Sequence, residues 1–236
     1  MPLARWWPRL IPLHGNPSIG TVDVDPQEWL AIASDVAAAG GQLLALWTTL
    51  ERDSDVHATV RAALLADSKV LVPTLQMPAA TASYPGLQHF FPAATRMQRA
   101  AFDLTGVPSD DPDRRPWLRH AAWRHDEHPL RDPLPPVAAA PVAVDDYAFV
   151  RVDGEGVHEI PVGPVHAGII EPGHFRFSIV GEKVLKLEER LGYVHKGIER
   201  RFSDMPALEG HRLAARVSGD SAVAFSWAYC QALEGS

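Results

Sequence analysis

The chain has 236 residues, a formal net charge of −7 at pH 7 and a single cysteine. Hydrophobic residues make up 46% of it and charged residues 22%, which is typical of a soluble globular protein with one large or two ordinary domains. The negative charge gives no whole-chain attraction to nucleic acid or to an anionic membrane surface. One cysteine excludes an internal disulfide framework and a metal cluster held by several thiolates of this chain alone.

The sequence shows no pattern for membrane spanning or secretion. No apolar run approaches the roughly 20 residues that a membrane-spanning helix needs. Trp6 and Trp7 are followed by Pro8, Arg9 and Pro12, which is not the pattern of a signal peptide. We therefore expect a cytoplasmic protein that reaches a membrane only through partners.

The first part of the chain combines one helix pattern with several strand patterns. Asp25 and Pro26 suit the N-cap and first turn of a helix, apolar residues recur at helical spacing from Trp29 to Ala37, and Gly40-Gly41 ends it. Strands are expected at residues 20–24, 42–50, 57–65 and 69–75, with turns at 51–55 and 66–68. One helix beside an antiparallel meander predicts an α+β domain.

A second helix is predicted at residues 95–104, followed by a tail that ends in His128-Pro129-Leu130-Arg131. Arg99, Asp103 and Arg131 carry opposite charges, and we predict a partly buried ionic network that fixes this tail against the helix. A set of solvated surface charges is the alternative.

Two histidines in the tail suggest a metal site only superficially. His125 and His128 flank Asp126 and Glu127, but neighbouring histidines and carboxylates in a loop are more often unliganded. We predict no metal here and expect this domain to scaffold an interface.

Residues 132–141 are rich in proline and alanine and show no periodicity, which is typical of a semi-rigid spacer. We therefore divide the chain into a first domain at 1–134, a linker at 135–144 and a second domain at 145–236.

The second domain is predicted to be a small antiparallel sheet that leads into long helices. Strands are expected at residues 147–152, 156–162, 175–180 and 183–187. One helix is expected from near His195 to before Pro206, and another from about Ala207 through Ala232 with a bend near Gly219. These helices would leave an apolar face uncovered, so we expect a partner chain there or a shortened gene product.

Four motifs distinguish the second domain. They are Pro161 to His166, Glu171 to Phe177, Gly192 to Glu199, and Arg216 to Ser221. The series resembles the start of the large subunit of energy-converting nickel–iron hydrogenases of the formate hydrogenlyase type, and the related quinone-site subunit of respiratory complex I. Residues 83–131 are similar in order to the small hydrophilic subunit of complex I, which docks beside the quinone-site subunit. The resemblance implies a fused, shortened homologue of two peripheral-arm subunits.

The sequence departs from this family where a hydrogenase binds nickel. Ser218 and Ser221 stand in the places of two cysteines, and serine hydroxyls are hard ligands where the nickel–iron centre needs soft thiolates. Counting without gaps from Gly192, the quinone-contacting tyrosine of the family falls on Leu213. We therefore predict no metal in this chain and no turnover by the chain alone.

The resemblance assigns roles to four residues around the first two motifs. It implies that His166 contacts a quinone head group, to which an imidazole could donate a hydrogen bond or a proton. The alternative is a histidine that only bonds its own loop. Glu171, His174 and Arg176 match the second motif, in which the resemblance implies that the glutamate lies beside the metal centre and relays protons. Without nickel, we expect Glu171 to persist as part of a polar network.

His195 and Glu199 match the third motif. They are four residues apart, so on a helix they would share one face, where a hydrogen bond between them is a simpler explanation than a metal pair. The candidate catalytic residues are therefore His166, Glu171, His174, Arg176 and Glu199, and the candidate cofactor-binding residues are His166 and His195.

The resemblance predicts a subunit of a membrane-associated oxidoreductase on the inner face of the cell membrane. Electrons would pass from NADH-, ferredoxin- or formate-linked partners toward quinone or another acceptor. Iron–sulfur clusters would reside in partner subunits, because this chain lacks the cysteines, and antiporter-like subunits would supply the membrane part. A non-catalytic structural or assembly module is the alternative. A hydrolase using His166, or His195 with Glu199, is disfavoured because no nucleophile elbow or zinc-binding His-Glu-x-x-His is present.

Overall fold

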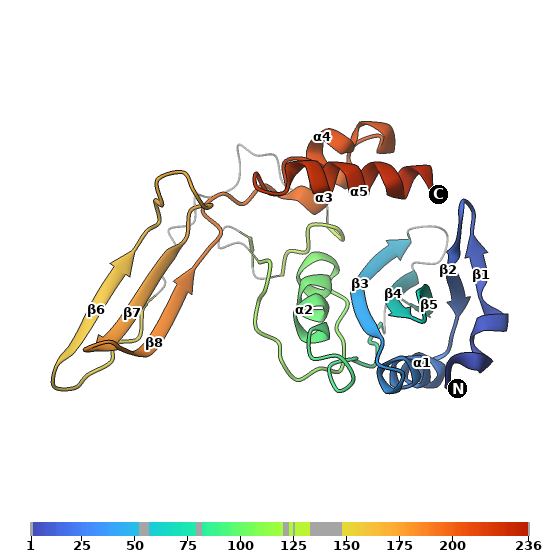
Figure 1. Ribbon diagram of the computed structural model, residues 1–236, viewed down its shortest axis with the longest axis horizontal. Helices are drawn as coiled ribbons and strands as arrows, with labels where there is room; N and C mark the ends of the chain where they lie inside the picture. The colour runs from blue at the N-terminus through green and yellow to red at the C-terminus, as the bar shows by residue number, and fades with distance from the viewer. Residues whose placement is uncertain are drawn as a thin grey trace. The chain divides into compact units, whose positions relative to one another are not determined.

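The computed structural model describes residues 2–51, 57–78, 82–119, 123–124, 126–132 and 148–235. It is a mixed α+β structure, which confirms the predicted fold class (Figure 1). The chain forms two compact units, of which the first takes in residues 1–119, 125–136 and 198–236 and the second residues 120–124 and 137–197. The predicted linker at 135–144 lies outside the described residues.

A five-stranded sheet forms the centre of the first unit. Its strands are β1 (Ile11–Leu13), β2 (Asn16–Asp23), β3 (Gln42–Glu51), β4 (His57–Ala66) and β5 (Lys69–Pro78), in the order β1-β2-β5-β4-β3. The predicted meander of β3, β4 and β5 is confirmed, because both neighbouring pairs are antiparallel. The sequence patterns predicted neither the short edge strand β1 nor the parallel pairing of β2 with β5.

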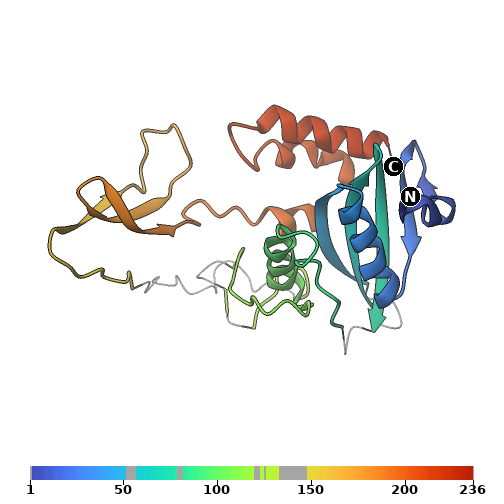
Figure 2. The ribbon, with the colours of Figure 1, turned by 60° about the horizontal axis from the view of Figure 1, so that its bottom comes forward.

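Helix α1 (Pro26–Ala38) begins and ends as predicted. The Asp25 carboxylate accepts the Glu28 backbone N–H at 2.8 Å, and the Glu28 carboxylate accepts the Asp25 N–H at 3.4 Å, which together form a capping box. Gly40 follows the helix with a left-handed φ of 74°, which few other residues adopt without strain. Helix α1 lies against the sheet (Figure 2). The face that it buries in the core carries Trp29, Ile32, Ala33 and Val36.

Helix α2 (Ala94–Thr105) confirms the second predicted helix and lies beside β3 (Figure 1). Gly106 ends it in a left-handed conformation and donates its N–H to the Phe102 carbonyl at 2.8 Å. The hydroxyls of Thr48 on β3 and Thr105 on α2 are buried and lie 2.6 Å apart. Because Thr105 donates its proton to the Ala101 carbonyl at 2.8 Å, Thr48 is the donor in the bond between helix and strand.

The second unit contains a three-stranded antiparallel sheet (Figure 1). Its strands, in spatial order, are β6 (Val157–Val162), β7 (His174–Val180) and β8 (Lys183–Arg190). They confirm the three strands predicted between residues 156 and 187. One row across the sheet is apolar, because Ile160 pairs with Phe177 and Phe177 pairs with Leu187.

The strand predicted at residues 147–152 is wrong for residues 148–152, and Tyr147 lies outside the described residues. The Val150 backbone N–H donates to the Glu188 carboxylate at 3.2 Å, whereas in a strand it would donate to a neighbouring main chain. This segment therefore attaches to β8 through a side chain, which alternation of apolar and polar residues does not distinguish from strand pairing.

The helices that follow the sheet are shorter than predicted. They are α3 (Ile198–Ser203), α4 (His211–Ala214) and α5 (Ala222–Glu234), with a 3₁₀ turn, η5 (Ala207–Glu209), before α4. Gly197 has a φ of 61°, so α3 begins after it and not near His195. In the described residues, no helix combines the length and the apolar character that crossing a bilayer requires.

The single helix predicted from 207 to 232 is wrong, because residues 215–221 interrupt it. The N–H groups of Arg216 and Val217 donate to the third preceding carbonyls, at 2.8 and 3.2 Å, which tightens the chain out of the α-helical pattern. Serine, glycine and aspartate at 218–220 are weak helix formers, so the helix does not resume until Ala222.

We predict that Asp25→Ala lowers the free energy of unfolding by about 1 kcal/mol, because the substitution leaves the Glu28 N–H at the start of α1 without its acceptor. Urea denaturation followed by circular dichroism measures the change. Asp25→Asn is the matched control, because its amide oxygen still accepts the bond; equal losses in both variants would contradict the assigned cap.

Candidate functional site

The candidate site in the second unit lies around the loop of residues 163–173, which joins β6 to β7. Two histidines fasten this loop. The His166 ring lies with Nε2 at 2.7 Å from the Gly173 carbonyl oxygen, and the His174 ring lies with Nδ1 at 3.2 Å from the Gly163 carbonyl oxygen. A carbonyl only accepts, so each of these ring nitrogens carries the proton and donates it. The loop is thus closed from both ends by side chains that bond its main chain.

His166 takes the role that the sequence left as its alternative, a bond within its own loop. The ring is half-buried and packs edge-on to Phe175, with centroids 5.7 Å apart. The bond to Gly173 uses one ring nitrogen, and Nδ1 is left for a second interaction.

His174 and Arg176 lie two residues apart on β7 and so face the same side of the sheet. Both contact the Phe149 ring, His174 at 5.3 Å between centroids and Arg176 with its guanidinium carbon 4.2 Å from the centroid. Arg176 also approaches Glu159 at 3.6 Å. Within the described residues, His174 Nε2 and Arg176 Nε are buried and have no hydrogen-bond partner.

Glu171 does not join this group. Its carboxylate forms an ion pair with Lys196 at 2.7 Å, and its side chain is 54% exposed. An exposed pair of this kind contributes about 0–1 kcal/mol, since water competes for both charges. The polar partner of Glu171 is therefore Lys196, and not His174 or Arg176 of the same motif.

His195 and Glu199 do not share a helix face. His195 precedes α3, and its exposed ring packs edge-on to Trp123 at 5.6 Å between centroids. Glu199 lies in the first turn of α3, where a negative charge favours the positive end of the helix dipole, and belongs to the other unit. The spacing argument was wrong because it assumed that the helix begins near His195.

Leu213, at the position where the family tyrosine was expected, is buried in α4. Ser218 and Ser221 lie in the turn between α4 and α5, where the Ser221 N–H donates to the Ser218 carbonyl at 3.3 Å. In the part of the chain that the structure describes, no group of three or more histidine, cysteine or acidic side chains could hold a metal ion.

The first unit contains a polar arrangement that sequence reasoning missed. The Asp103 carboxylate is buried and accepts three successive backbone N–H groups, from Trp117 and Leu118 at 2.7 Å and from Arg119 at 3.3 Å. The Asp103 carbonyl accepts from His128 Nδ1 at 3.1 Å. Asp103 therefore fastens the following loop through main-chain atoms.

The predicted network of Arg99, Asp103 and Arg131 is consequently wrong. Arg99 pairs with Asp113 at 3.7 Å, and Arg131 pairs with Asp132 at 2.9 Å. A hydrogen bond from Arg131 lowers the pKa of Asp132. Opposite charges in the sequence suggested the pairing, whereas backbone N–H groups leave no signal in a residue pattern. His125 of the tail lies outside the described residues.

Comparison with known proteins gives a consistent set of relatives. Residues 22–139 match the family model described as the 30 kDa subunit of respiratory-chain NADH dehydrogenase. The chain is 32% identical to hydrogenase-4 component G of Escherichia coli K12 over 204 residues, covering 83% of this chain and 37% of that protein. It is 30% identical to formate hydrogenlyase subunit 5 of the same organism, covering 84% of this chain and 36% of that protein.

A further relative is the C/D subunit of the NADH-quinone oxidoreductase of Phocaeicola vulgatus, which is 25% identical over 167 residues, or 64% of this chain and 32% of that protein. The chain thus spans between 32% and 37% of the length of these three relatives. The solved structure of an Nqo5 fragment is 16% identical with a TM-score of 0.36, covering 43% of this chain and 88% of that one.

We predict that His166→Ala increases the exchange rate of the Gly173 amide hydrogen roughly fivefold, because about 1 kcal/mol of loop closure is lost. The Gly173 N–H donates to the Pro164 carbonyl at 3.2 Å, so hydrogen exchange at this amide reports on the closed loop. His158→Ala is the matched control, since His158 is an exposed histidine on β6. Unchanged protection in His166→Ala would contradict the closure.

We predict that Asp103→Ala lowers the free energy of unfolding by about 1–3 kcal/mol, because three backbone N–H groups lose their acceptor. Urea denaturation measures the loss. Asp220→Ala, at an exposed position between α4 and α5, should change stability by less than about 0.5 kcal/mol. Similar losses in the two variants would refute the role given to Asp103.

Proposed function

Because the chain belongs to the family of the respiratory-chain NADH dehydrogenase 30 kDa subunit, we propose that it is a subunit of a membrane-associated oxidoreductase complex of the complex I or energy-converting hydrogenase type. One observation carries this proposal: hydrogenase-complex and NADH-quinone oxidoreductase subunits align with the same chain, two of them over more than four-fifths of its length. The complex would transfer electrons from NADH-, ferredoxin- or formate-linked partners toward quinone or another acceptor.

The chain itself does not supply the thiolates of a nickel–iron centre. Ser218 and Ser221 offer hydroxyls in the motif where the centre needs sulfur, and Cys230 in α5 is the only thiol of the sequence. One cysteine also cannot hold an iron–sulfur cluster of the four-cysteine type. In this proposal the clusters are therefore carried by partner subunits, and the chain meets the inner face of the cell membrane only through such partners.

A second candidate function is a non-catalytic structural or assembly module of such a complex. It is favoured by the contacts of the candidate residues, all of which are made within the chain itself. His166 and His174 hold the 163–173 loop, Glu171 forms an exposed ion pair, and His195 packs on Trp123. With Nε2 bonded to Gly173, His166 could donate from Nδ1 to a quinone oxygen only when both ring nitrogens are protonated. The effect of replacing His166 therefore distinguishes the two candidate functions.

The test uses the complex isolated from the native host with an affinity tag on this chain. We expect the tagged chain to co-purify, after mild detergent extraction of membranes, with subunits that carry iron–sulfur clusters and with membrane subunits. Electron paramagnetic resonance identifies the clusters, and metal analysis of the isolated chain should show no stoichiometric nickel. Recovery of the chain as a free protein without iron–sulfur partners would contradict the proposal.

Quinone reductase activity of the purified complex then separates the two candidates. If the chain takes part in quinone reduction, His166→Phe lowers turnover at least tenfold while His158→Phe leaves it unchanged, because only the first removes an imidazole from the loop. Equal activity of both variants, with the partners still bound, supports the structural module.

A further inference from the structure

Two buried carboxylates, those of Asp103 and Asp111, accept hydrogen bonds from the two ends of the segment of residues 110–119 in the first unit. Asp103 accepts the N–H groups at its far end. At the near end, Asp111 is 3% exposed and accepts from Gln98 Nε2 and from the Asp113 backbone N–H, each at 2.9 Å. Both ends of the segment are thus held by buried carboxylates.

This segment presents a cationic and aromatic surface. Arg114, Arg115 and Pro116 are exposed, and Trp117 is 49% exposed. The guanidinium carbons of Arg96 and Arg99, one turn apart on α2, each lie 5.2 Å from the Trp117 ring centroid. We call Arg96, Arg99, Arg114, Arg115 and Trp117 the arginine–tryptophan patch.

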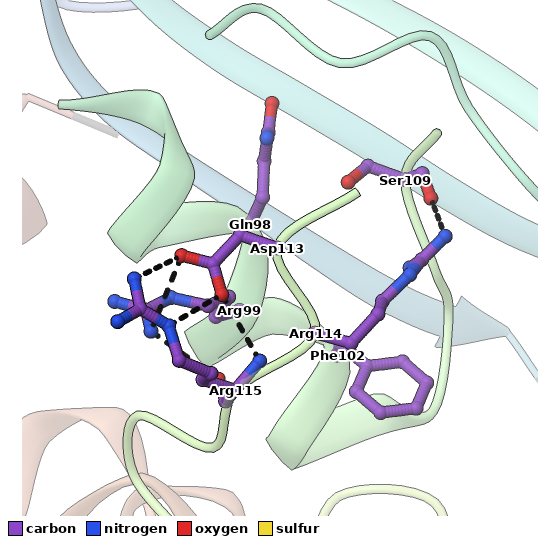
Figure 3. Close-up of a pocket in the computed structure, with 7 residues that line it drawn as sticks. All are labelled: Gln98, Arg99, Phe102, Ser109, Asp113, Arg114 and Arg115. Carbon is purple, nitrogen blue, oxygen red and sulfur yellow. Dashed lines mark hydrogen bonds and ion pairs between the residues drawn. The ribbon is translucent and has the colours of Figure 1, made fainter. Parts of the chain in front are cut away.

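A small cavity opens into this patch, with room for about one water-sized group (about 10 Å³). Its lining residues are Gln98, Arg99, Phe102, Ser109, Asp113, Arg114 and Arg115. Figure 3 shows the Asp113 carboxylate against the guanidinium groups of Arg99 and Arg115, while Arg114 reaches in the other direction to the Ser109 carbonyl.

Several N–H donors of the patch remain unused. Arg99 Nε is buried and has no hydrogen-bond partner within the described residues. Arg114 donates to the Ser109 carbonyl through one terminal nitrogen and has four further N–H groups. Arg115 spends Nε and one terminal nitrogen on Asp113, and this bond lowers the pKa of Asp113. Asp113 pairs with both Arg99 and Arg115, whereas within the described residues Arg96 and Arg114 form no ion pair, so these two guanidinium groups have no carboxylate against them.

We propose that the arginine–tryptophan patch binds an acidic segment of a protein partner, with one oxygen of a partner carboxylate at the mouth of the cavity that Arg99 and Arg114 line. Arg115 and Asp113 already form the two-bond pairing that a planar guanidinium makes with a carboxylate. The apolar stem of the partner's acidic side chain packs on Trp117, while Arg96 adds an exposed charge at the rim.

A protein carboxylate fits this surface better than a lipid headgroup does. The patch contains arginine and no lysine. The planar guanidinium of arginine can donate two parallel hydrogen bonds to a carboxylate, so it recognises the shape of that group as well as its charge. The charges of the patch are also held in place by Asp113 and by the loop backbone, whereas attraction to an anionic bilayer needs only a diffuse basic cluster.

The test measures binding of a fluorescein-labelled hexaglutamate peptide to the full chain by fluorescence anisotropy. We expect saturable binding that weakens as salt is raised, and no binding of a hexaglutamine peptide. The double variant Arg114→Gln/Arg115→Gln should bind at least tenfold more weakly. The matched control is Arg201→Gln/Arg212→Gln, which removes the same charge from exposed positions on α3 and α4.

Equal weakening in the two double variants would overturn the proposal, because binding would then follow net charge alone. So would stronger binding to phosphatidylserine vesicles with the same dependence on Arg114 and Arg115. If the double variant fails to fold by circular dichroism, Arg96→Gln replaces it, since Arg96 is exposed at the rim; it should weaken peptide binding roughly threefold, and no change would refute the patch.

The proposal stands apart from the proposed function. Peptide binding is a property of the first unit and is measured without any redox partner. Loss of peptide binding would leave co-purification with iron–sulfur subunits untouched, and absence of those subunits would leave peptide binding untouched.

Discussion

The buried carboxylate of Asp103 is the constraint around which the second half of the first unit is arranged. A buried carboxylate is costly unless hydrogen bonds satisfy it, and Asp103 obtains them from three backbone N–H groups of residues 117–119. At the other end of that segment, the buried Asp111 carboxylate accepts the Asp113 backbone N–H and the Gln98 side-chain amide. In the second unit the side chains are the donors: the rings of His166 and His174 donate to carbonyl groups of the 163–173 loop. Both units thus hold irregular chain by side-chain contacts to main-chain atoms.

These bonds between side chains and the main chain explain which features could be predicted from the sequence and which could not. Helix α1 and strands β3 to β8 could be predicted from the Asp25 cap, apolar periodicity and turn residues, because these signals depend only on the types of neighbouring residues. The ionic network of Arg99, Asp103 and Arg131 failed, because the groups that bond Asp103 are common to every residue and carry no pattern. The helix from 207 to 232 failed similarly, since its break depends on weak helix formers at 218–220. The candidate site residues were found through motifs, but their contacts with Gly163, Gly173 and Phe149 were not.

The two units differ in how far they stabilise themselves. The first has a core that joins α1 to the five-stranded sheet. In the second, among residues 148–197, the buried positions are Gly173 and Ser178, and the row of Ile160, Phe177 and Leu187 lies half-buried or exposed. A three-stranded sheet with so little buried apolar surface gains little free energy from its own folding. A sheet of this kind gains stability from contacts outside itself, as the proposed place in a larger assembly would provide.

Anchoring through the main chain has a consequence for how this protein can vary. The Asp103 carboxylate accepts backbone N–H groups, which every residue except proline supplies, so positions 117 to 119 are open to exchange while Asp103 is not. Descendants of one ancestor could therefore replace what this loop displays, and with it the molecule it meets, without rebuilding the scaffold underneath. Divergence would then be concentrated on the outward side chains and be nearly absent from the acidic residue below them.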